Sequence, residues 1–213
     1  KGKGPGEYLS ISDFQLNKKH KNIEILDLLG KKLLRYDFNG NFIEKWNHNM
    51  QAEKFTKMSP NKYVFYNDNN ITDNCRYKLV IKNYQNKSTI ANYFKITKNQ
   101  YRYLHIGDRH NFSFYKNRCL FFYPENDTIY QLTKDNGLKN RYIIDFGSNS
   151  MPNKFLKRKF KDIMEFMESF KKHKYASIIG YFFETKKYLL FKFRYNGEDI
   201  WCINQKNQEN KVL

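Results

Sequence analysis

The chain has 213 residues, 40% of them hydrophobic and 18% aromatic, and a formal net charge of +18. This length and this hydrophobic content are enough for a packed core, so the composition argues against a disordered chain. No apolar run approaches the roughly 18 residues of a membrane-spanning helix, so we expect no such helix. The aromatic residues are mainly Phe and Tyr, 19 and 17 against 2 Trp, and both types favour strands.

The positive charge has two interpretations. It is typical of a protein that binds a polyanion such as nucleic acid. It also follows from A/T-rich codons, which raise Lys and Asn together with Ile, Phe and Tyr. Few of the 39 basic residues are Arg, the residue best suited to forked phosphate contacts, and the lysines are scattered along the chain. We favour codon bias and predict no nucleic-acid partner, with polyanion binding as a lesser alternative.

The chain opens on KGKGPGEYLS, with neither an initiator Met nor an apolar signal segment. Gly4 and Gly6 flank Pro5, which indicates a tight reversal before the first strand. Asn39–Gly40 is a hairpin signal between two later apolar runs. The first group of four strands is expected at 9–17, 21–29, 32–38 and 41–47.

Three further groups of strands follow, separated by turns rich in Asn, Gly, Ser and Pro. The second is expected at 52–58, 62–68, 77–84 and 88–94, and the third at 111–116, 118–124, 128–134 and 139–146. The fourth is expected at 176–185, 188–196 and 199–206, with 210–213 starting a last strand.

A segment at 152–174 breaks the series and is predicted to be a helical insertion. Its apolar residues recur at alternating spacings of four and three, and Phe155, Met164 and Phe166 widen the resulting face. A basic amphipathic helix of this kind suits a membrane surface or a partner. We favour the alternative, a helix packed on the sheets with its lysines in solvent. The regularly spaced residues are Leu156, Phe160, Ile163, Met167 and Phe170.

Without this insertion the four groups repeat about every 45–50 residues, which is typical of propeller blades. The sequence therefore predicts an all-β fold, a β-propeller of four-stranded antiparallel blades. An ordinary β-sandwich with coincidental spacing is the alternative.

Three segments carry a family resemblance. GKGPGEY, and later LLRYDFNGNFIEKW at 33–46, resemble the six-bladed β-propeller proteins of Bacteroides-type bacteria, many of them predicted lipoproteins; IIGYFFETKKYLLFKF at 178–193 resembles a later segment of that family. The resemblance implies an extracytoplasmic protein, in the periplasm or at the cell surface, with any lipid anchor outside this chain. It also implies six blades where four are visible. We therefore expect residues 1–213 to form one propeller domain that is incomplete at both ends, with exposed blade edges that favour self-association.

No catalytic motif, phosphate loop or metal-ligand spacing occurs, so we predict no cofactor, metal or catalytic residue. Cys75, Cys119 and Cys202 are widely spaced, which argues against a zinc site and a disulfide framework. Cys119 and Cys202 lie in apolar runs and are expected to be buried.

Two polar clusters are candidate binding sites. The first lies before the third group of strands and could bind a metal or act as base and orienter. The second combines aromatic rings and amides in inter-strand connections, which suits sugar recognition. For both, ordinary turn chemistry is the alternative. The candidate residues are His105, Asp108, Arg109 and His110 in the first cluster and Trp46, His48, Asn67 and Asn69 in the second.

The sequence therefore predicts a non-enzymatic binding scaffold at the cell envelope that engages a glycan, a peptide or a partner protein. The alternative is a propeller enzyme, a lyase or hydrolase with a funnel of His, Asp and Arg.

Overall fold

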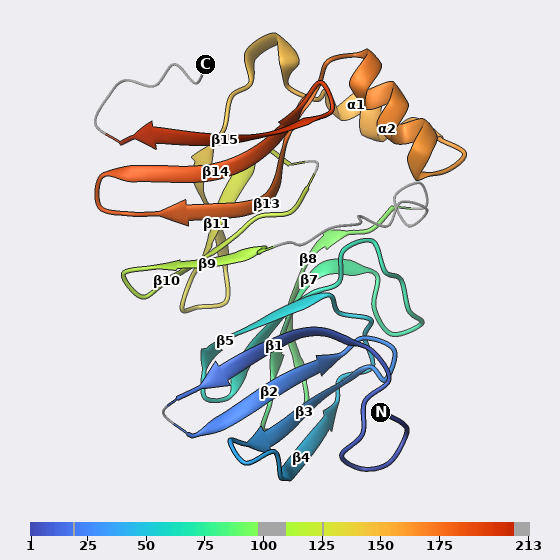
Figure 1. The fold of residues 1–213 in the computed structure, drawn as a ribbon, viewed down its shortest axis with the longest axis vertical. Helices are drawn as coiled ribbons and strands as arrows, with labels where there is room; N and C mark the ends of the chain where they lie inside the picture. Colours follow the sequence, from blue (N-terminus) through green and yellow to red (C-terminus); the bar gives the residue numbers. More distant parts are fainter. Residues whose placement is uncertain (19, 98–109, 125, 207–213) are drawn as a thin grey trace. The chain divides into compact units, whose positions relative to one another are not determined.

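The computed structural model describes residues 1–18, 20–97, 110–124 and 126–206. The contacts within the chain divide it into two units, Lys1–Thr97 and Lys98–Leu213. Each unit is described by itself below (Figure 1).

The first unit contains two four-stranded antiparallel sheets, each a meander in which consecutive strands pair. The predicted strands are found at nearly their expected positions. The first sheet is β1 (Ile11–Asn17), β2 (Asn22–Asp27), β3 (Lys32–Asp37) and β4 (Phe42–Asn47); the second is β5 (Lys54–Ser59), β6 (Lys62–Tyr66), β7 (Tyr77–Asn83) and β8 (Thr89–Lys95).

The hairpin turn between β3 and β4 shows how local chemistry fixes this register. Gly40 adopts a φ of +86°, which a residue without Cβ reaches at no steric cost. The Asp37 carboxylate accepts the backbone N–H groups of Asn39 at 2.9 Å and Asn41 at 2.8 Å. Asn39 itself is not among the residues with positive φ, so only one half of the Asn–Gly pair uses the left-handed region.

The two sheets of the first unit share one hydrophobic core, to which both contribute large side chains. Trp46 on β4 is 3% exposed and packs edge-on against Tyr63 and Phe65 of β6, with ring centroids 5.5 Å apart in each case. The remaining buried members are Leu26, Leu33, Met50, Ala52, Phe55, Cys75 and Val80.

A buried polar network also joins the two sheets. Glu24 on β2 is 1% exposed and accepts from Arg35 on β3 at 2.8 Å and from the Tyr63 hydroxyl on β6 at 2.5 Å. Lys57 of β5 lies 3.6 Å from the same carboxylate. Since a buried carboxylate is stable only when it is paired and hydrogen-bonded, this network ties the second sheet to the first in one register.

The second unit contains a four-stranded antiparallel sheet and a three-stranded one, and β9 lies beside β13. The expected last strand at 210–213 lies outside the described residues. The sheets are β9 (Phe112–Tyr115), β10 (Arg118–Phe121), β11 (Thr128–Leu132) and β12 (Leu138–Ile143), and β13 (Ala176–Glu184), β14 (Tyr188–Tyr195) and β15 (Glu198–Gln205). Their shared core consists of Leu120, Phe122, Ile129, Ile144, Ile178, Phe182, Leu189 and Phe191.

The predicted single helix at 152–174 is instead two helices, α1 (Asn153–Leu156) and α2 (Ile163–Lys172). Asp162 interrupts the helix: its backbone is extended, and its side chain caps α2 by accepting from the Glu165 N–H at 3.0 Å. The same apolar spacing continues through both helices, so it does not reveal the break between them.

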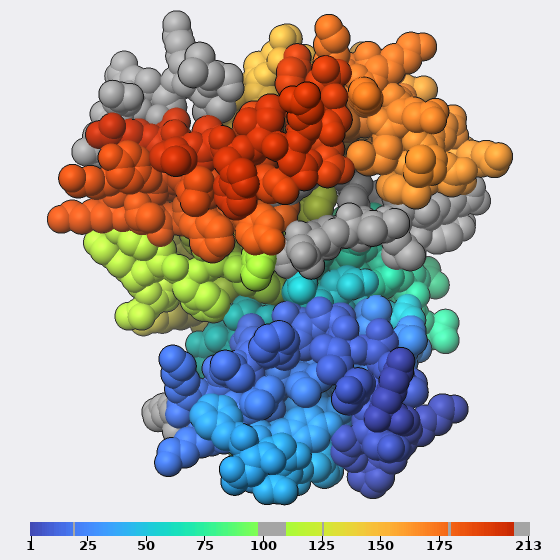
Figure 2. Space-filling model, in the orientation of Figure 1, coloured from blue at the N-terminus to red at the C-terminus, as the bar shows by residue number. Residues whose placement is uncertain are grey.

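The expected packing of this segment on the sheets also needs correction. Its buried rings form a separate cluster in which Phe166 lies 5.5 Å from Phe155 and 5.4 Å from Phe160 between ring centroids. Met164, predicted to widen the apolar face, is 65% exposed because it points away from this cluster. Figures 1 and 2 place the helices (orange) beside the β14–β15 turn (red), where a Cβ at Gly197 would lie 3.5 Å from the Lys171 side chain.

The fold is thus all-β and propeller-like, built from antiparallel blades with one helical insertion, as expected from the sequence. All three cysteines are free; Cys75 and Cys119 are buried and Cys202 is half-buried. In the described part of the chain, no helix is long and apolar enough to cross a membrane.

Candidate functional site

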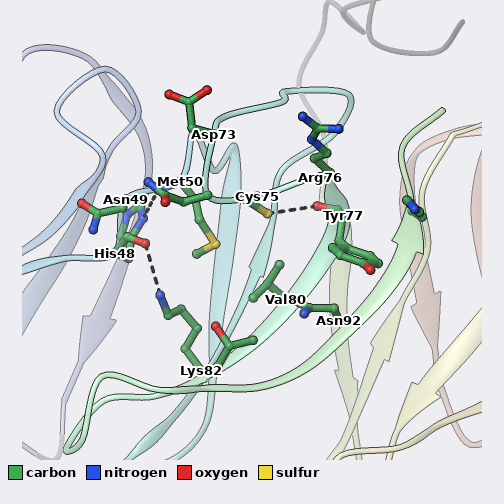
Figure 3. Close-up of a pocket in the computed structure, with 13 residues that line it drawn as sticks. His48, Asn49, Met50, Asp73, Cys75, Arg76, Tyr77, Val80, Lys82 and Asn92 are labelled. Carbon is green, nitrogen blue, oxygen red and sulfur yellow. Dashed lines mark hydrogen bonds between the residues drawn. The ribbon is translucent and has the colours of Figure 1, made fainter. Parts of the chain in front are cut away.

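A pocket of about 530 Å³ opens in the first unit (Figure 3). Its walls come from the β4–β5 loop, the β6–β7 loop and one face of β7 and β8. Both loops lie at the same end of the two sheets, because each follows an even-numbered strand of an antiparallel meander. The volume falls within the range of about 300–1,000 Å³ that is typical of small-molecule sites. The lining residues are His48, Asn49, Met50, Asp73, Asn74, Cys75, Arg76, Tyr77, Val80, Lys82, Thr89, Asn92 and Lys95.

The β6–β7 loop is held in place by the side chain of Asn67, which is fully buried. Its amide donates to the Tyr77 carbonyl at 2.9 Å and to the Cys75 sulfur at 3.1 Å. Thr72 and Cys75 close the loop through a pair of backbone hydrogen bonds at 3.0 and 3.1 Å. The pocket wall that carries Asp73 and Arg76 is therefore fixed from the core.

The face of β7 and β8 supplies the floor through cross-strand pairs. Val80 lies opposite Asn92, and Lys82 opposite Thr89. Residues at alternate positions of a strand point to the same face, so Val80 and Lys82 both project into the pocket. Figure 3 shows Cys75 and Val80 between Arg76 on one side and Lys82 on the other.

Lys82 is the half-buried cation of the site. Its ammonium donates to the His48 carbonyl at 3.2 Å (Figure 3), and burial lowers its pKa. Arg76 and Lys95 add two exposed cations, and Asp73 is the only carboxylate that lines the pocket. The pocket as described is therefore positively charged.

His48 forms a buried wall of the pocket and is 1% exposed. Burial, and secondarily the charge of Lys82, lower its pKa to about 3, so the ring is neutral at physiological pH. Its Nδ1 accepts from the Met50 N–H at 3.2 Å, which leaves the proton on Nε2. Nε2 is buried and has no hydrogen-bond partner among the described residues. The imidazole thus positions the β4–β5 loop.

The side chains of this pocket offer cations, amides and a hydroxyl around an apolar floor. Burial raises the pKa of the Cys75 thiol, which keeps the sulfur protonated and a poor nucleophile. Across the described ranges, no group of three or more His, Cys, Asp and Glu side chains could hold a metal ion. Cations, amides and an apolar floor are suited to recognising a polar ligand.

Only His48 of the predicted binding residues lines this pocket. Trp46 lies in the core with its ring faces against protein, so it is not an exposed platform for stacking on a sugar. Asn67 supports the loop from behind, and Asn69, 1% exposed, accepts a hydrogen bond from Lys78. A direct binding role for these residues stays a prediction.

The other predicted cluster is largely outside the described residues: His105, Asp108 and Arg109 all lie at 98–109. His110 is described and exposed. Its backbone N–H donates to the Gly180 carbonyl at 2.6 Å, and its ring lies 4.8 Å from that of Tyr181.

Sequence reasoning missed Arg76, Lys82, Thr89, Asn92 and Lys95. One signal was available for Lys82. In the run YKLVIKNY, Lys82 lies two residues after the buried Val80 and therefore on the same face of the strand. A lysine at such a position is a charged group beside the core.

Comparisons with known proteins place the whole chain in one group. A family model described as "Domain of unknown function (DUF4934)" matches residues 1–213. A search of curated proteins found no match.

Two solved structures match the chain, and one of them is similar in fold. One is a "Putative exported protein" from Bacteroides fragilis NCTC 9343, with 17% identity over 97% of this chain and a TM-score of 0.73. This chain spans 58% of that protein's length. The other, a member of the DUF4221 family from Bacteroides vulgatus ATCC 8482, is 11% identical over 95% of this chain and 69% of its own, with a TM-score of 0.49.

Proposed function

The chain belongs to the DUF4934 family of domains of unknown function, and we propose that it is a non-enzymatic scaffold of the cell envelope that binds a glycan. The observation that carries this proposal is the pocket of the first unit. It combines a small-molecule volume with amide, hydroxyl and ammonium groups above an apolar floor. Such a combination suits a saccharide, whose C–H face packs on apolar side chains while its hydroxyls pair with polar ones.

The proposal includes an extracytoplasmic location and a propeller of the six-bladed type. The repeated antiparallel blades support the propeller. The similar fold of the Bacteroides fragilis protein, described as exported, supports the location. Attachment to a membrane would then use a lipid anchor outside this chain.

The enzymatic alternative stays a prediction, since three of its four residues lie outside the described part of the chain. The polyanion alternative also stays a prediction, and no described feature favours a phosphate backbone over a smaller ligand.

The test is a pocket-filling variant. Asn92 is exposed on β8, the edge strand of its sheet, and Asn92→Trp places a large ring in the pocket at little cost to the core. We expect the wild-type protein to bind some glycans of a glycan array and Asn92→Trp not to bind them. Lys45→Trp, at an exposed position on β4 outside the pocket, is the matched control and should bind as the wild type does.

Three results would count against the proposal. Equal binding by Asn92→Trp would move the ligand away from this pocket. Retention of peptides instead of glycans would correct the ligand class. Absence of any glycan binding by the wild-type protein at millimolar concentration would reject the function.

A further inference from the structure

The charge of Lys82 is not balanced by the protein. Its ammonium has a backbone carbonyl, that of His48, as its hydrogen-bond acceptor at 3.2 Å. No carboxylate among the described residues lies within ion-pair distance of it. Elsewhere in the same unit the buried charges are paired: Glu24 with Arg35 at 2.8 Å, and Asp27 with Lys32 at 3.8 Å.

Half-burial makes this imbalance costly. Removing an ammonium from water disfavours its charged form, which is why the pKa of Lys82 is lowered. A ligand anion beside the ammonium would compensate the lost hydration more fully than a carbonyl dipole does. A negatively charged ligand group beside Lys82 would therefore be stabilised at this end of the pocket.

The other charged residues of the pocket do not compensate the charge of Lys82. Asp73 is exposed on the β6–β7 loop, and Figure 3 shows its carboxylate at the top of the view and Lys82 at the bottom. Arg76 lies on the other side of Cys75 from Lys82, where it adds another cation. Lys95, opposite Tyr77 in the β7–β8 register, adds a third.

The uncharged residues of the pocket indicate what kind of molecule would carry the anion. Val80, Met50 and Cys75 are buried and give the pocket an apolar floor. Thr89 and Asn92 are exposed along β8 and offer a hydroxyl and an amide beside that floor. A free inorganic anion would leave the apolar floor unused, whereas a pyranose ring that carries a carboxylate would use both the floor and the polar groups.

We propose that the pocket binds an acidic saccharide, with a uronate carboxylate on Lys82, the sugar ring over Val80 and its hydroxyls toward Thr89 and Asn92. Arg76 and Lys95 receive the charge of a neighbouring acidic unit at the other end. This inference rests on the proposed function and specifies its ligand class.

The experiment compares two probes with the same sugar units, trigalacturonate and its uncharged trimethyl ester, in which each carboxylate carries a methyl group. Binding of each is measured by isothermal titration calorimetry to the wild-type protein, to Lys82→Met and to Lys45→Met. Met keeps most of the apolar stem of Lys, and Lys45 is an exposed lysine of β4 outside the pocket, so Lys45→Met controls for net charge.

We expect trigalacturonate to bind the wild-type protein and Lys45→Met about equally. Lys82→Met should bind it at least about tenfold more weakly, the scale of one lost hydrogen bond to a charged group. The ester should bind more weakly and respond little to either change. Urea unfolding without ligand should show Lys82→Met to be as stable as the wild type or more so, which separates a ligand contact from a structural role.

Equal binding of acid and ester would overturn the acidic assignment, and so would a Lys82→Met variant that binds the acid normally. In either case the glycan-binding function would survive if Asn92→Trp still abolished binding. Competition by millimolar sodium phosphate as effective as that by galacturonate would overturn the role of the sugar ring. Failure of the wild-type protein to bind trigalacturonate at all would overturn this inference and leave the glycan array to decide the broader function.

Discussion

Burial of His48 makes the free energy of unfolding of the first unit depend on pH. The folded ring has a pKa of about 3, against 6.5 for an ordinary His. Between these values the unfolded chain binds a proton that the folded chain does not, so the unfolded state gains stability as the pH falls. The stabilising contribution of the neutral ring is complete above pH 6.5 and is lost as the pH decreases toward 3.

We predict that the first unit loses roughly 3 kcal/mol of unfolding free energy between pH 7 and pH 4 through this residue. His48→Asn retains an acceptor for the Met50 N–H but cannot titrate, so its stability should be lower at pH 7 and change less with pH. Urea unfolding followed by Trp46 fluorescence in a Trp201→Phe background measures this, because Trp46 lies in the core of the first unit.

Exposed His20 provides the matched control, and His20→Asn should keep the pH dependence of the wild type. A pH dependence that is the same in His48→Asn as in the wild type would assign the acid sensitivity to other groups.

At the scale of elements, the helical segment is a small independent core. Phe155, Phe160, Phe166 and Phe170 are buried against one another rather than within the core of the sheets. Such a satellite cluster can open without unfolding the strands, because few of its apolar contacts reach them.

We predict that Phe166→Ala unfolds this segment locally. The ring is 5% exposed, and truncating a buried Phe typically costs about 3–5 kcal/mol. Limited trypsin digestion should cleave the variant at the lysines of 157–161 faster than the wild type, while the fluorescence of Trp201, which lies on β15 of the same unit, is unchanged. Met164→Ala, at a position 65% exposed, should be cleaved at the wild-type rate. Simultaneous loss of the Trp201 signal in Phe166→Ala would show that the segment and the sheets of the second unit unfold together.

At the scale of the whole molecule, two strands carry large apolar side chains that are exposed to solvent. Phe14 and Leu16 on β1 are 62% and 56% exposed, and Trp201 and Ile203 on β15 are 51% and 71% exposed. Each pair sits at alternate positions of one strand, so its two side chains share a face. β15 is also a terminal strand of its sheet among the described residues, which leaves an edge for pairing, whereas β1 lies beside β5.

We therefore predict that the 213-residue chain self-associates through these surfaces. Size-exclusion chromatography with light scattering should give a mass above that of one chain at tens of micromolar. Replacing Phe14 and Leu16 by Lys, or Trp201 and Ile203 by Lys, should shift the mass toward the monomer. Met164→Lys, which removes an exposed apolar side chain outside the sheets, should have no effect. A wild-type chain that elutes as a monomer would contradict the prediction.

The sequence by itself determined the strands and their grouping. The predicted strand at 32–38 is β3 at Lys32–Asp37, and that at 188–196 is β14 at Tyr188–Tyr195. Alternation of side chains and the turn residues between strands are local properties, so they can be read without knowing which sheets meet. The break before α2 was also open to sequence analysis, since Asp162 and Glu165 have the spacing of a capping box.

Only the tertiary structure decided which polar and aromatic side chains are available to a ligand. Trp46 was predicted to stack on a sugar but is buried, because the β5–β8 sheet covers the face of β4 that carries it. Lys82 was one of many lysines until packing beside His48 left its charge half-buried and unbalanced. Exposure and charge compensation depend on segments far apart in the chain, and local pattern carries no information about either.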